Sequence, residues 1–256
     1  MPYAYNRRIR IHYEVEGDGP PLVLLHGGLN DLRVWYDLGY IESLKNDYRL
    51  ILIDLRGYGA SDKPHDSRAY EMKLLVDDIV AVLDDLKVGK AHLLGYSLSG
   101  RICFGAAKYA PERFHSFIIG GAHAGMLDQN EHKDDVELLK KGADALIAAI
   151  EKDLGSQLPP ERRARLAAID FEAVVALFSA SHWRLSFEDV LPAMTMLCLI
   201  FVGEADSLHS GAKECAKNLP NATFISFPNL GHFQLLSQRH LLLPHITKFL
   251  TKASQT

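Results

Sequence analysis

The chain has 256 residues, of which 48% are hydrophobic and 23% are charged, and its formal net charge at pH 7 is -4. This apolar content can build a sizeable core, so we expect a globular protein rather than a disordered one. The sequence has no excess of Lys and Arg, which argues against a nucleic-acid backbone as partner. Neither a secretory leader nor an apolar stretch of membrane-spanning length is visible, so we predict a cytoplasmic protein.

Short apolar runs alternate with longer amphipathic ones along most of the chain. The first run, residues 8–17, alternates strictly and predicts an edge strand with one wet face. Five further runs predict strands buried on both faces at the centre of a sheet: 21–25, 49–54, 91–95, 115–121 and 196–203. Apolar residues at helical spacing predict helices over 31–46, 71–87, 98–109, 209–218 and 237–252. This order is typical of an α/β fold with a mostly parallel sheet flanked by helices.

The alternation of strands and helices is interrupted once, between about residues 123 and 192, where the sequence is mainly helical. The pair Pro159 and Pro160 divides this segment into two parts. We therefore predict a helical lid, or cap, over residues 123–192. It is inserted between two strands of a core that comprises residues 1–122 and 193–256.

The sequence GYSLSG, residues 95–100, lies between a predicted strand and a predicted helix. A serine on such a corner has strained backbone angles and an exposed hydroxyl, and it needs small residues two positions before and after it. Ser97 has Gly95 and Ser99 at those positions, whereas Ser99 would have the bulky Arg101. The size of the neighbours therefore favours Ser97 as a nucleophile.

This corner resembles the G-x-S-x-G nucleophile elbow of the α/β-hydrolase superfamily, with Ser99 in place of the second glycine. The turn LIDLRGYGASDKP also resembles a D-x-R-G-x-G-x-S turn of these hydrolases, and we assign it a structural role. The resemblance covers roughly residues 10–120 and 193–250 and implies the α/β-hydrolase fold. The predicted lid matches no segment that we can name.

A serine hydroxyl needs a base to take its proton and a carboxylate to orient that base. In the superfamily these residues follow in the order Ser, acid, His. Asp206 comes just after the strand predicted at 196–203, and His232 follows a further strand and precedes the last helix. The resemblance thus implies a triad of Ser97, Asp206 and His232, although Asp206 could instead cap a helix and Glu204 is a competing acid.

Acyl transfer also needs two N–H donors for the oxygen that becomes negative in the tetrahedral intermediate. The resemblance implies the backbone amide of Leu98, at the start of a helix, and that of Gly28 in the loop LLHGGLND, with Leu29 as second choice. We expect His26 to brace this loop through its ring nitrogens rather than to take part in the chemistry.

The function implied by this resemblance is a serine hydrolase that cleaves a small carboxylic ester or lactone through an acyl-enzyme. No metal and no organic cofactor are implied, and the three widely separated cysteines predict neither a disulfide framework nor a metal site. The expected partner is the small-molecule substrate, with no nucleic acid and no membrane insertion. A homodimer is among the oligomeric states that the sequence leaves open.

Candidates for the substrate pocket come from the corner, the loop and the lid. They are Leu29, Tyr96, Phe178, His182 and Trp183, of which the last three could equally be packing residues of the lid.

Three alternatives to an esterase or lactonase remain at this stage. The same triad serves carbon–carbon bond hydrolases, amidases and cofactor-free perhydrolases, and the triad alone does not choose among them. A non-catalytic receptor or scaffold is a second alternative, although all three triad residues are present. An epoxide hydrolase or dehalogenase requires an Asp at the elbow, where this chain has Ser97.

Overall fold

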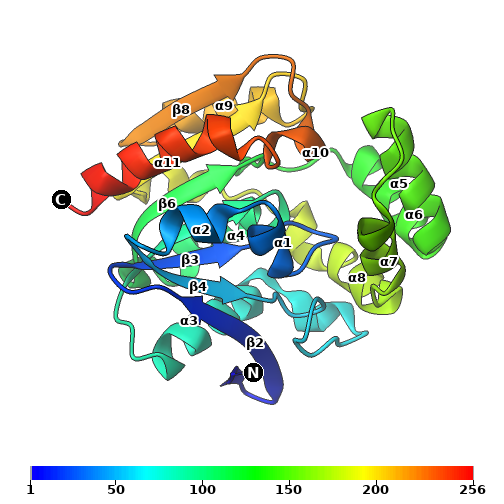
Figure 1. Ribbon diagram of the computed structural model, residues 1–256, viewed down its shortest axis with the longest axis horizontal. Helices are drawn as coiled ribbons and strands as arrows, with labels where there is room; N and C mark the ends of the chain where they lie inside the picture. Colours follow the sequence, from blue (N-terminus) through cyan, green and yellow to red (C-terminus); the bar gives the residue numbers. More distant parts are fainter. Residues whose placement is uncertain (1, 256) are drawn as a thin grey trace.

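The computed structural model describes residues 2–255, except for the side chains of Asp153 and His182. Eight strands form one sheet in the order β1-β2-β4-β3-β5-β6-β7-β8 (Figure 1). The strands are β1 Tyr3–Asn6, β2 Ile9–Glu16, β3 Pro21–Leu25, β4 Arg49–Ile53, β5 Ala91–Tyr96, β6 Phe114–Gly120, β7 Leu197–Gly203 and β8 Ala222–Phe227. The pairs β1/β2 and β2/β4 are antiparallel and every other pair is parallel. The predicted mostly parallel sheet, with the five central strands, is confirmed.

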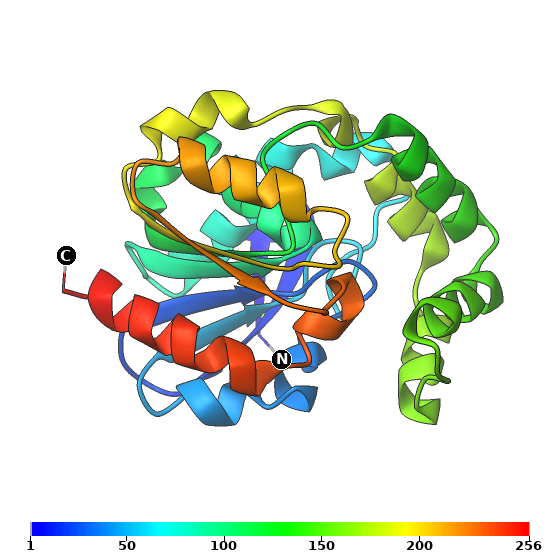
Figure 2. The same cartoon turned by 90° about the horizontal axis from the view of Figure 1, so that it is seen from above.

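Helices cover both faces of the sheet (Figures 1 and 2). One face carries α1 Arg33–Asp37, α2 Tyr40–Leu44 and α11 Arg239–Ala253, and the other carries α3 Met72–Asp85, α4 Leu98–Tyr109 and α9 His209–Asn218. Along β3, Leu22 and Leu24 belong to the core under the first set, whereas Val23 and Leu25 belong to the core under the second. Because alternate side chains enter two separate cores, the central strands are continuous apolar runs.

The prediction that residues 8–17 form an edge strand is wrong. The strand β2 lies between β1 and β4, and β1 is the edge. A two-residue turn, Arg7 and Arg8, joins β1 to β2, and Arg7 adopts a φ of 56°. Because this turn lacks the Gly or Asn that usually marks a tight hairpin, the sequence gives no sign of the first strand.

The helix predicted over 31–46 is two short helices, α1 and α2, separated by Gly39. Gly39 has a φ of 73°, in the left-handed region that residues with a Cβ seldom adopt, so the chain turns there. The remaining helices predicted for the core are present as α3, α4, α9 and α11. A short additional helix, α10 His232–Leu235, precedes α11.

Residues 121–196 connect β6 to β7 and form a helical segment beside the core (Figure 2). Its helices are α5 Gln129–Lys140, α6 Ala143–Leu154, α7 Pro160–Ala167 and α8 Phe171–Phe178, followed by short 3-10 helices over Ser181–Arg184 and Glu188–Ala193. The carboxyl ends of the parallel strands point toward this segment (Figure 1). Its position suits a lid, and the domain boundaries stay a prediction.

Arg101, in the first turns of α4, holds both ends of the helical segment. Its guanidinium donates to the carbonyl oxygens of His123 at 3.1 Å, Gly125 at 2.8 Å and Leu185 at 2.9 Å. Burial lowers the pKa of Arg101 to about 10. Three backbone carbonyls thus take the place of a carboxylate partner, and the guanidinium links the beginning of the segment to its end.

Within the part of the chain that the structure describes, none of the helices combines the length and the apolar character that crossing a bilayer requires.

Candidate active site

The corner that carries Ser97 joins β5 to α4 with no intervening loop. Ser97 has φ 58° and ψ -117°, and its N–H donates to the carbonyl oxygen of Gly120 on the neighbouring strand at 2.8 Å. A non-glycine residue with positive φ is uncommon and costs free energy, of order 1–3 kcal/mol. Such strain is typical of a nucleophile elbow, where it turns the hydroxyl out toward the substrate.

Two glycines allow helix α4 to pack closely at this corner, Gly95 against strand β5 and Gly100 against the end of β6. A Cβ added to Gly95 would lie 2.3 Å from the carbonyl oxygen of Ser99, and one added to Gly100 would lie 2.5 Å from the Cβ of Ala122. Both distances are too short for non-bonded atoms. The close contact that the motif requires is therefore supplied by Gly95 and Gly100, and the position between them accepts a serine.

The hydroxyl of Ser99 has a structural partner. Ser99 is fully buried, and its Oγ donates to the carbonyl oxygen of His26 in the loop after β3. A glycine at this position could not make that bond. Ser99 therefore ties the corner that carries Ser97 to the loop that carries Gly28.

His26 braces that loop, as the sequence predicts. Its Nδ1 lies 2.8 Å from the carbonyl oxygen of Gly27, and its Nε2 accepts from the N–H of Leu55 at 3.1 Å. Because Nε2 accepts, the ring proton is assigned to Nδ1 and the imidazole is neutral. Burial lowers the pKa of His26, which also keeps the ring neutral.

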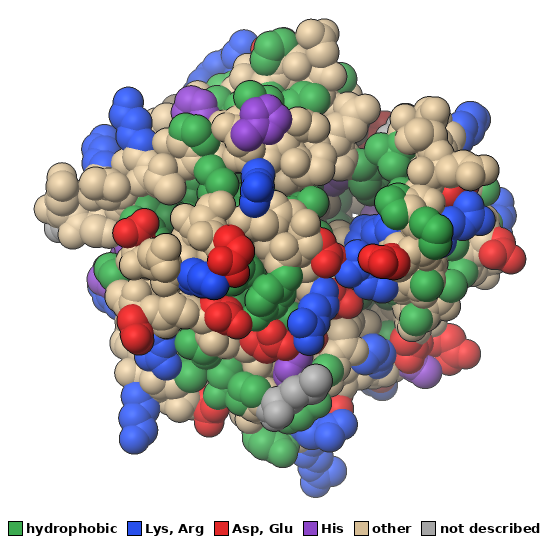
Figure 3. Space-filling model, in the orientation of Figure 1, with side chains coloured by type: hydrophobic (Ala, Val, Ile, Leu, Met, Phe, Trp, Pro, Cys, Tyr) green, Lys and Arg blue, Asp and Glu red, His purple; other side chains and the backbone are tan. Residues whose placement is uncertain are grey.

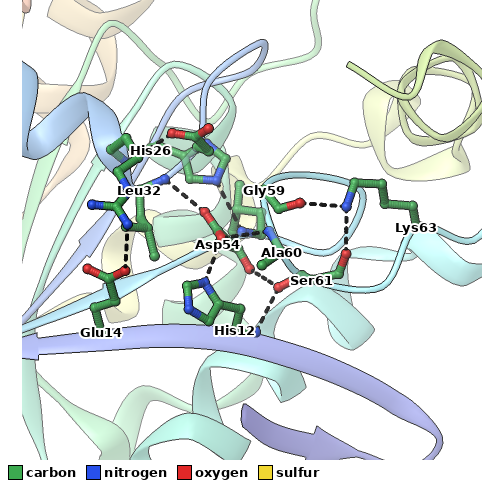
Figure 4. A network of polar contacts seen from close by, with 12 residues as sticks. His12, Glu14, His26, Leu32, Asp54, Gly59, Ala60, Ser61 and Lys63 are labelled. Atoms are coloured by element: carbon green, nitrogen blue, oxygen red, sulfur yellow. Dashed lines mark hydrogen bonds and ion pairs between the residues drawn. The ribbon is translucent and has the colours of Figure 1, made fainter. Parts of the chain in front are cut away.

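Asp54, at the end of β4, anchors the far end of the same loop (Figure 4). One carboxylate oxygen accepts from the N–H of Leu32 at 2.8 Å. The other accepts from the N–H of Ala60 at 2.9 Å and lies 2.8 Å from Nδ1 of His12. The loop between His26 and Leu32 is thus bonded to buried groups at both ends, which fixes the path of its amides.

The three candidate triad residues follow three different strands and meet at one edge of the sheet. Nε2 of His232 lies 2.9 Å from Oγ of Ser97, and Nδ1 lies 2.7 Å from Oδ2 of Asp206. Tyr96 holds the backbone of the histidine, because its hydroxyl donates to the carbonyl oxygen of His232 at 2.5 Å. Both ring nitrogens of His232 therefore face the partners that a triad requires.

Asp206 stays ionised although its side chain is buried. Its side chain is 1% exposed, and its second oxygen accepts from the N–H of Leu208 at 3.0 Å. Burial acts to raise the pKa of Asp206, but the hydrogen bond and charge of His232 and the Leu208 amide outweigh it, and the pKa falls below its usual value. Glu204, the competing acid, accepts instead from the hydroxyl of Ser226 at 3.0 Å.

The two predicted oxyanion donors belong to residues near Ser97, of which Leu98 follows it in the chain and Gly28 lines the same cavity. Leu98 is the first residue of the twelve-residue helix α4, where backbone N–H groups have no partner within the helix and the helix dipole favours an anion. Gly28 lines the same cavity as Ser97 and His232. Leu29, the second choice, lines a neighbouring cavity instead. The role of the Leu98 and Gly28 amides stays a prediction.

A cavity of about 210 Å³ opens around Ser97. From the core it is lined by residues that include Gly28, Tyr96, Ser97, His232 and Phe233, and from α7 by Arg162 and Arg165. A second cavity of about 230 Å³ adjoins it and shares Asn30, Val34 and the two arginines. Figure 3 shows a hollow where the helical segment meets the core, with basic and acidic side chains at its rim.

The predicted pocket residues occupy different places. Tyr96 lines the cavity around Ser97. Phe178 meets the Gly28 loop, since a Cβ on Gly28 would lie 3.4 Å from its ring, and it stacks on Trp183 with ring centroids 5.0 Å apart. Trp183 is buried, and its Nε1 donates to the carbonyl oxygen of Leu177 at 2.8 Å. Neither Phe178 nor Trp183 lines the two described cavities, and the side chain of His182 lies outside the described residues.

Arg162, Arg165 and Phe233 line the cavity although the sequence does not single them out. The one available signal is the spacing of the two arginines, which places them one turn apart on the same side of an amphipathic helix. That pattern is equally typical of a solvated helix face, so the sequence alone does not assign it to a site. Among the described residues, no cluster of His, Cys, Asp or Glu could hold a metal ion.

Comparison with known proteins identifies the fold that carries this geometry. A family model described as "alpha/beta hydrolase fold" matches residues 20–142. The enol-lactonase from Burkholderia xenovorans LB400 superposes with a TM-score of 0.86 at 20% identity, over 98% of this chain and 100% of that one. The chain therefore has the α/β-hydrolase fold, and about half of it matches the sequence model of that family.

Relatives within this superfamily match over different lengths. The pimeloyl-[acyl-carrier protein] methyl ester esterase of Nitrosomonas europaea is 28% identical over 89% of this chain and 94% of its own length. Epoxide hydrolase 4 of Mus musculus is 35% identical, but the match covers 43% of this chain and 31% of that protein. A Bacillus subtilis relative at 29% identity is likewise matched over only 50% of its length.

Proposed function

We propose that this α/β-hydrolase is a serine hydrolase that cleaves a small carboxylic ester or lactone through an acyl-enzyme intermediate. The observation that carries the proposal is the unbroken series of contacts from Ser97 Oγ through His232 to Asp206, at 2.9 Å and 2.7 Å. A hydroxyl in contact with an imidazole, itself bonded to a buried carboxylate, is the arrangement that activates a serine.

In the proposed first half-reaction, the proton of the Ser97 hydroxyl moves to His232 Nε2 while Oγ bonds to the carbonyl carbon of the substrate. The bond from that carbon to the leaving oxygen then breaks, and the proton on Nε2 passes to the leaving oxygen. In the second half, water gives a proton to Nε2 and attacks the acyl carbon, and Oγ leaves and recovers the proton. The sum is the addition of one water across the ester.

Asp206 supports both halves as a carboxylate that stays ionised. Its lowered pKa keeps it negative at neutral pH, so it stabilises the imidazolium that forms each time His232 takes a proton. The amides of Leu98 and Gly28 are proposed to bind the oxygen of the tetrahedral intermediates. Each such donor contributes about 3–4 kcal/mol to the transition state.

Two comparisons support an ester or lactone as substrate. The Nitrosomonas europaea relative, matched over nearly its whole length, is named a methyl ester esterase. The Burkholderia structure is titled an enol-lactonase. The epoxide hydrolase relative matches less than half of the chain, and the Ser97 corner does not supply the Asp nucleophile that this chemistry requires.

A fluorophosphonate probe tests the proposal directly. The purified protein is expected to gain the mass of one phosphonyl group on Ser97, while Ser97→Ala stays unlabelled with an unchanged circular dichroism spectrum. In parallel, a panel of short-chain esters and lactones is assayed for turnover. Absence of labelling, together with no turnover of any ester or lactone, would refute the proposal and favour a binding protein.

A further inference from the structure

Helix α7 contributes two arginines to the cavity that holds the proposed nucleophile. Arg162 and Arg165 lie one turn apart, and both line the cavity around Ser97 and the cavity beside it. Arg163, between them, instead pairs with Glu151 of helix α6 at 2.6 Å. The helix therefore presents two cations to the site and keeps the third in a contact within the helical segment.

The two cavity arginines differ in their partners. Arg165 forms an ion pair at 2.5 Å with Asp37, at the end of α1, which bridges the helical segment to the core. Among the described residues, none forms an ion pair or a hydrogen bond with Arg162. Asp31 and Asp37 are near enough to act on its charge but do not pair with it. Arg162 is thus a cation that lines the site without a counter-charge of its own.

The charged lining of the Ser97 cavity has an excess of one positive charge. Apart from His232 and Tyr96, its ionisable side chains are Asp37, Arg162 and Arg165, and the pair between Asp37 and Arg165 leaves Arg162 uncompensated. Burial and the charge of Arg165 lower the pKa of Arg162 by more than Asp31 and Asp37 raise it, so the environment penalises this cation. A guanidinium nevertheless stays protonated in proteins, which makes the bare cation a binding site for an anion.

We propose that Arg162 binds a carboxylate on the substrate, so that the enzyme acts on esters or lactones that carry one negative charge. This inference rests on the proposed function. The planar guanidinium offers two parallel N–H donors that match the geometry of a carboxylate. One negative charge neutralises the excess of the cavity, whereas a doubly charged phosphate would leave a surplus beside Asp37 and Asp31.

Matched pairs of methyl esters test this inference. Monomethyl succinate, glutarate and adipate are each compared with the methyl ester of the unbranched monocarboxylic acid of equal length, and acid release is followed by pH-stat. For the best chain length, wild-type kcat/KM is expected to be higher for the carboxylate ester by roughly 10- to 100-fold, the range for a hydrogen bond to a charged group. The difference should lie mainly in KM, since Arg162 contacts the substrate away from the reacting carbonyl.

Variants of α7 then locate the effect. Arg162→Gln is expected to remove the preference by lowering kcat/KM for the anionic ester far more than for the neutral ester, and Arg162→Lys should restore part of the preference. The matched control is Arg163→Gln, which loses a partly exposed ion pair worth about 1 kcal/mol and should keep the wild-type preference for the anionic ester.

Failure of this inference can be told apart from failure of the proposed function. If Ser97 is labelled and neutral esters are hydrolysed, but the wild type does not prefer the anionic ester, only the role of Arg162 is refuted. The same holds if Arg162→Gln lowers kcat/KM equally for both esters, since that result shows a structural effect. If neither labelling nor turnover occurs with any ester, the proposed function itself fails.

Discussion

Replacing Ser99 by alanine is expected to destabilise the protein but to leave a working nucleophile. The substitution deletes the buried hydrogen bond from Ser99 to the carbonyl oxygen of His26. Leaving a buried acceptor without its donor costs about 1–3 kcal/mol. For a chain of this size each kcal/mol lowers Tm by about 2–4 °C, so we expect a decrease of roughly 2–12 °C.

The catalytic effect of the same change should be small, because Ser99 touches the loop through a carbonyl and not through a proposed oxyanion donor. We expect kcat/KM to fall by less than about tenfold, which corresponds to 1.4 kcal/mol. Ser97→Ala is expected to lose activity by several orders of magnitude, as removal of a nucleophile does. The two variants share the elbow and differ only in which hydroxyl is missing.

The measurements are thermal unfolding and steady-state hydrolysis of one ester by wild type, Ser99→Ala, Ser99→Gly and Ser97→Ala. Glycine should be the less stable of the two Ser99 variants by up to about 1 kcal/mol, since position 99 lies within helix α4. An unchanged Tm in Ser99→Ala would show that the bond to His26 contributes nothing. Equal loss of activity from Ser97→Ala and Ser99→Ala would refute the assignment of Ser97 as nucleophile.

Three further predictions concern the groups around the elbow. Asp206→Asn should lower kcat by about 10⁴-fold with the fold retained, because the amide favours the wrong tautomer of His232, and a loss under tenfold would contradict its role. Folding lowers the pKa of Asp206 from 3.8, so its charge stabilises the fold above pH 3.8, and this stabilisation is lost as the pH falls further. Urea unfolding from pH 6 to pH 3 should therefore show that the free energies of unfolding of wild type and Asp206→Asn approach each other. Arg101→Met should speed hydrogen exchange around residues 123–125 and 185 while the sheet amides stay protected, and uniform loss of protection would contradict a local clamp.

The elbow could be predicted because local sequence dictates it, whereas Asp206 and His232 were implied by the order of the triad residues in the superfamily that the sequence resembles. A serine at a strand–helix corner requires small neighbours, and this requirement separates Ser97 from Ser99 before any tertiary contact is known. The buried central strands were likewise visible, since a strand covered on both faces must be apolar throughout. The sequence did not predict features that depend on tertiary contacts, such as the partner of the Ser99 hydroxyl and the hairpin at Arg7 and Arg8.

Arg162 shows most clearly why the substrate could not be predicted from the sequence. Arg162, Arg163 and Arg165 are the same residue type within four positions, and helical spacing alone gives no reason to treat the first differently. The three arginines differ only in the folded chain, where Arg163 forms an ion pair with Glu151 and Arg165 forms one with Asp37. The selectivity of a site depends on which charge remains unpaired, and pairing is a property of the assembled structure.

In the proposed enzyme, the residues for the chemistry and the residue for selectivity lie on different parts of the fold. Ser97, Asp206 and His232 lie just beyond the carboxyl ends of strands, where their mutual hydrogen bonds and the strained backbone of Ser97 fix their positions. The uncompensated cation sits on α7, which reaches the core through the partly exposed pair between Arg165 and Asp37. An exposed pair of this kind contributes at most about 1 kcal/mol, so substitutions on α7 should change which ester is bound without disturbing the triad.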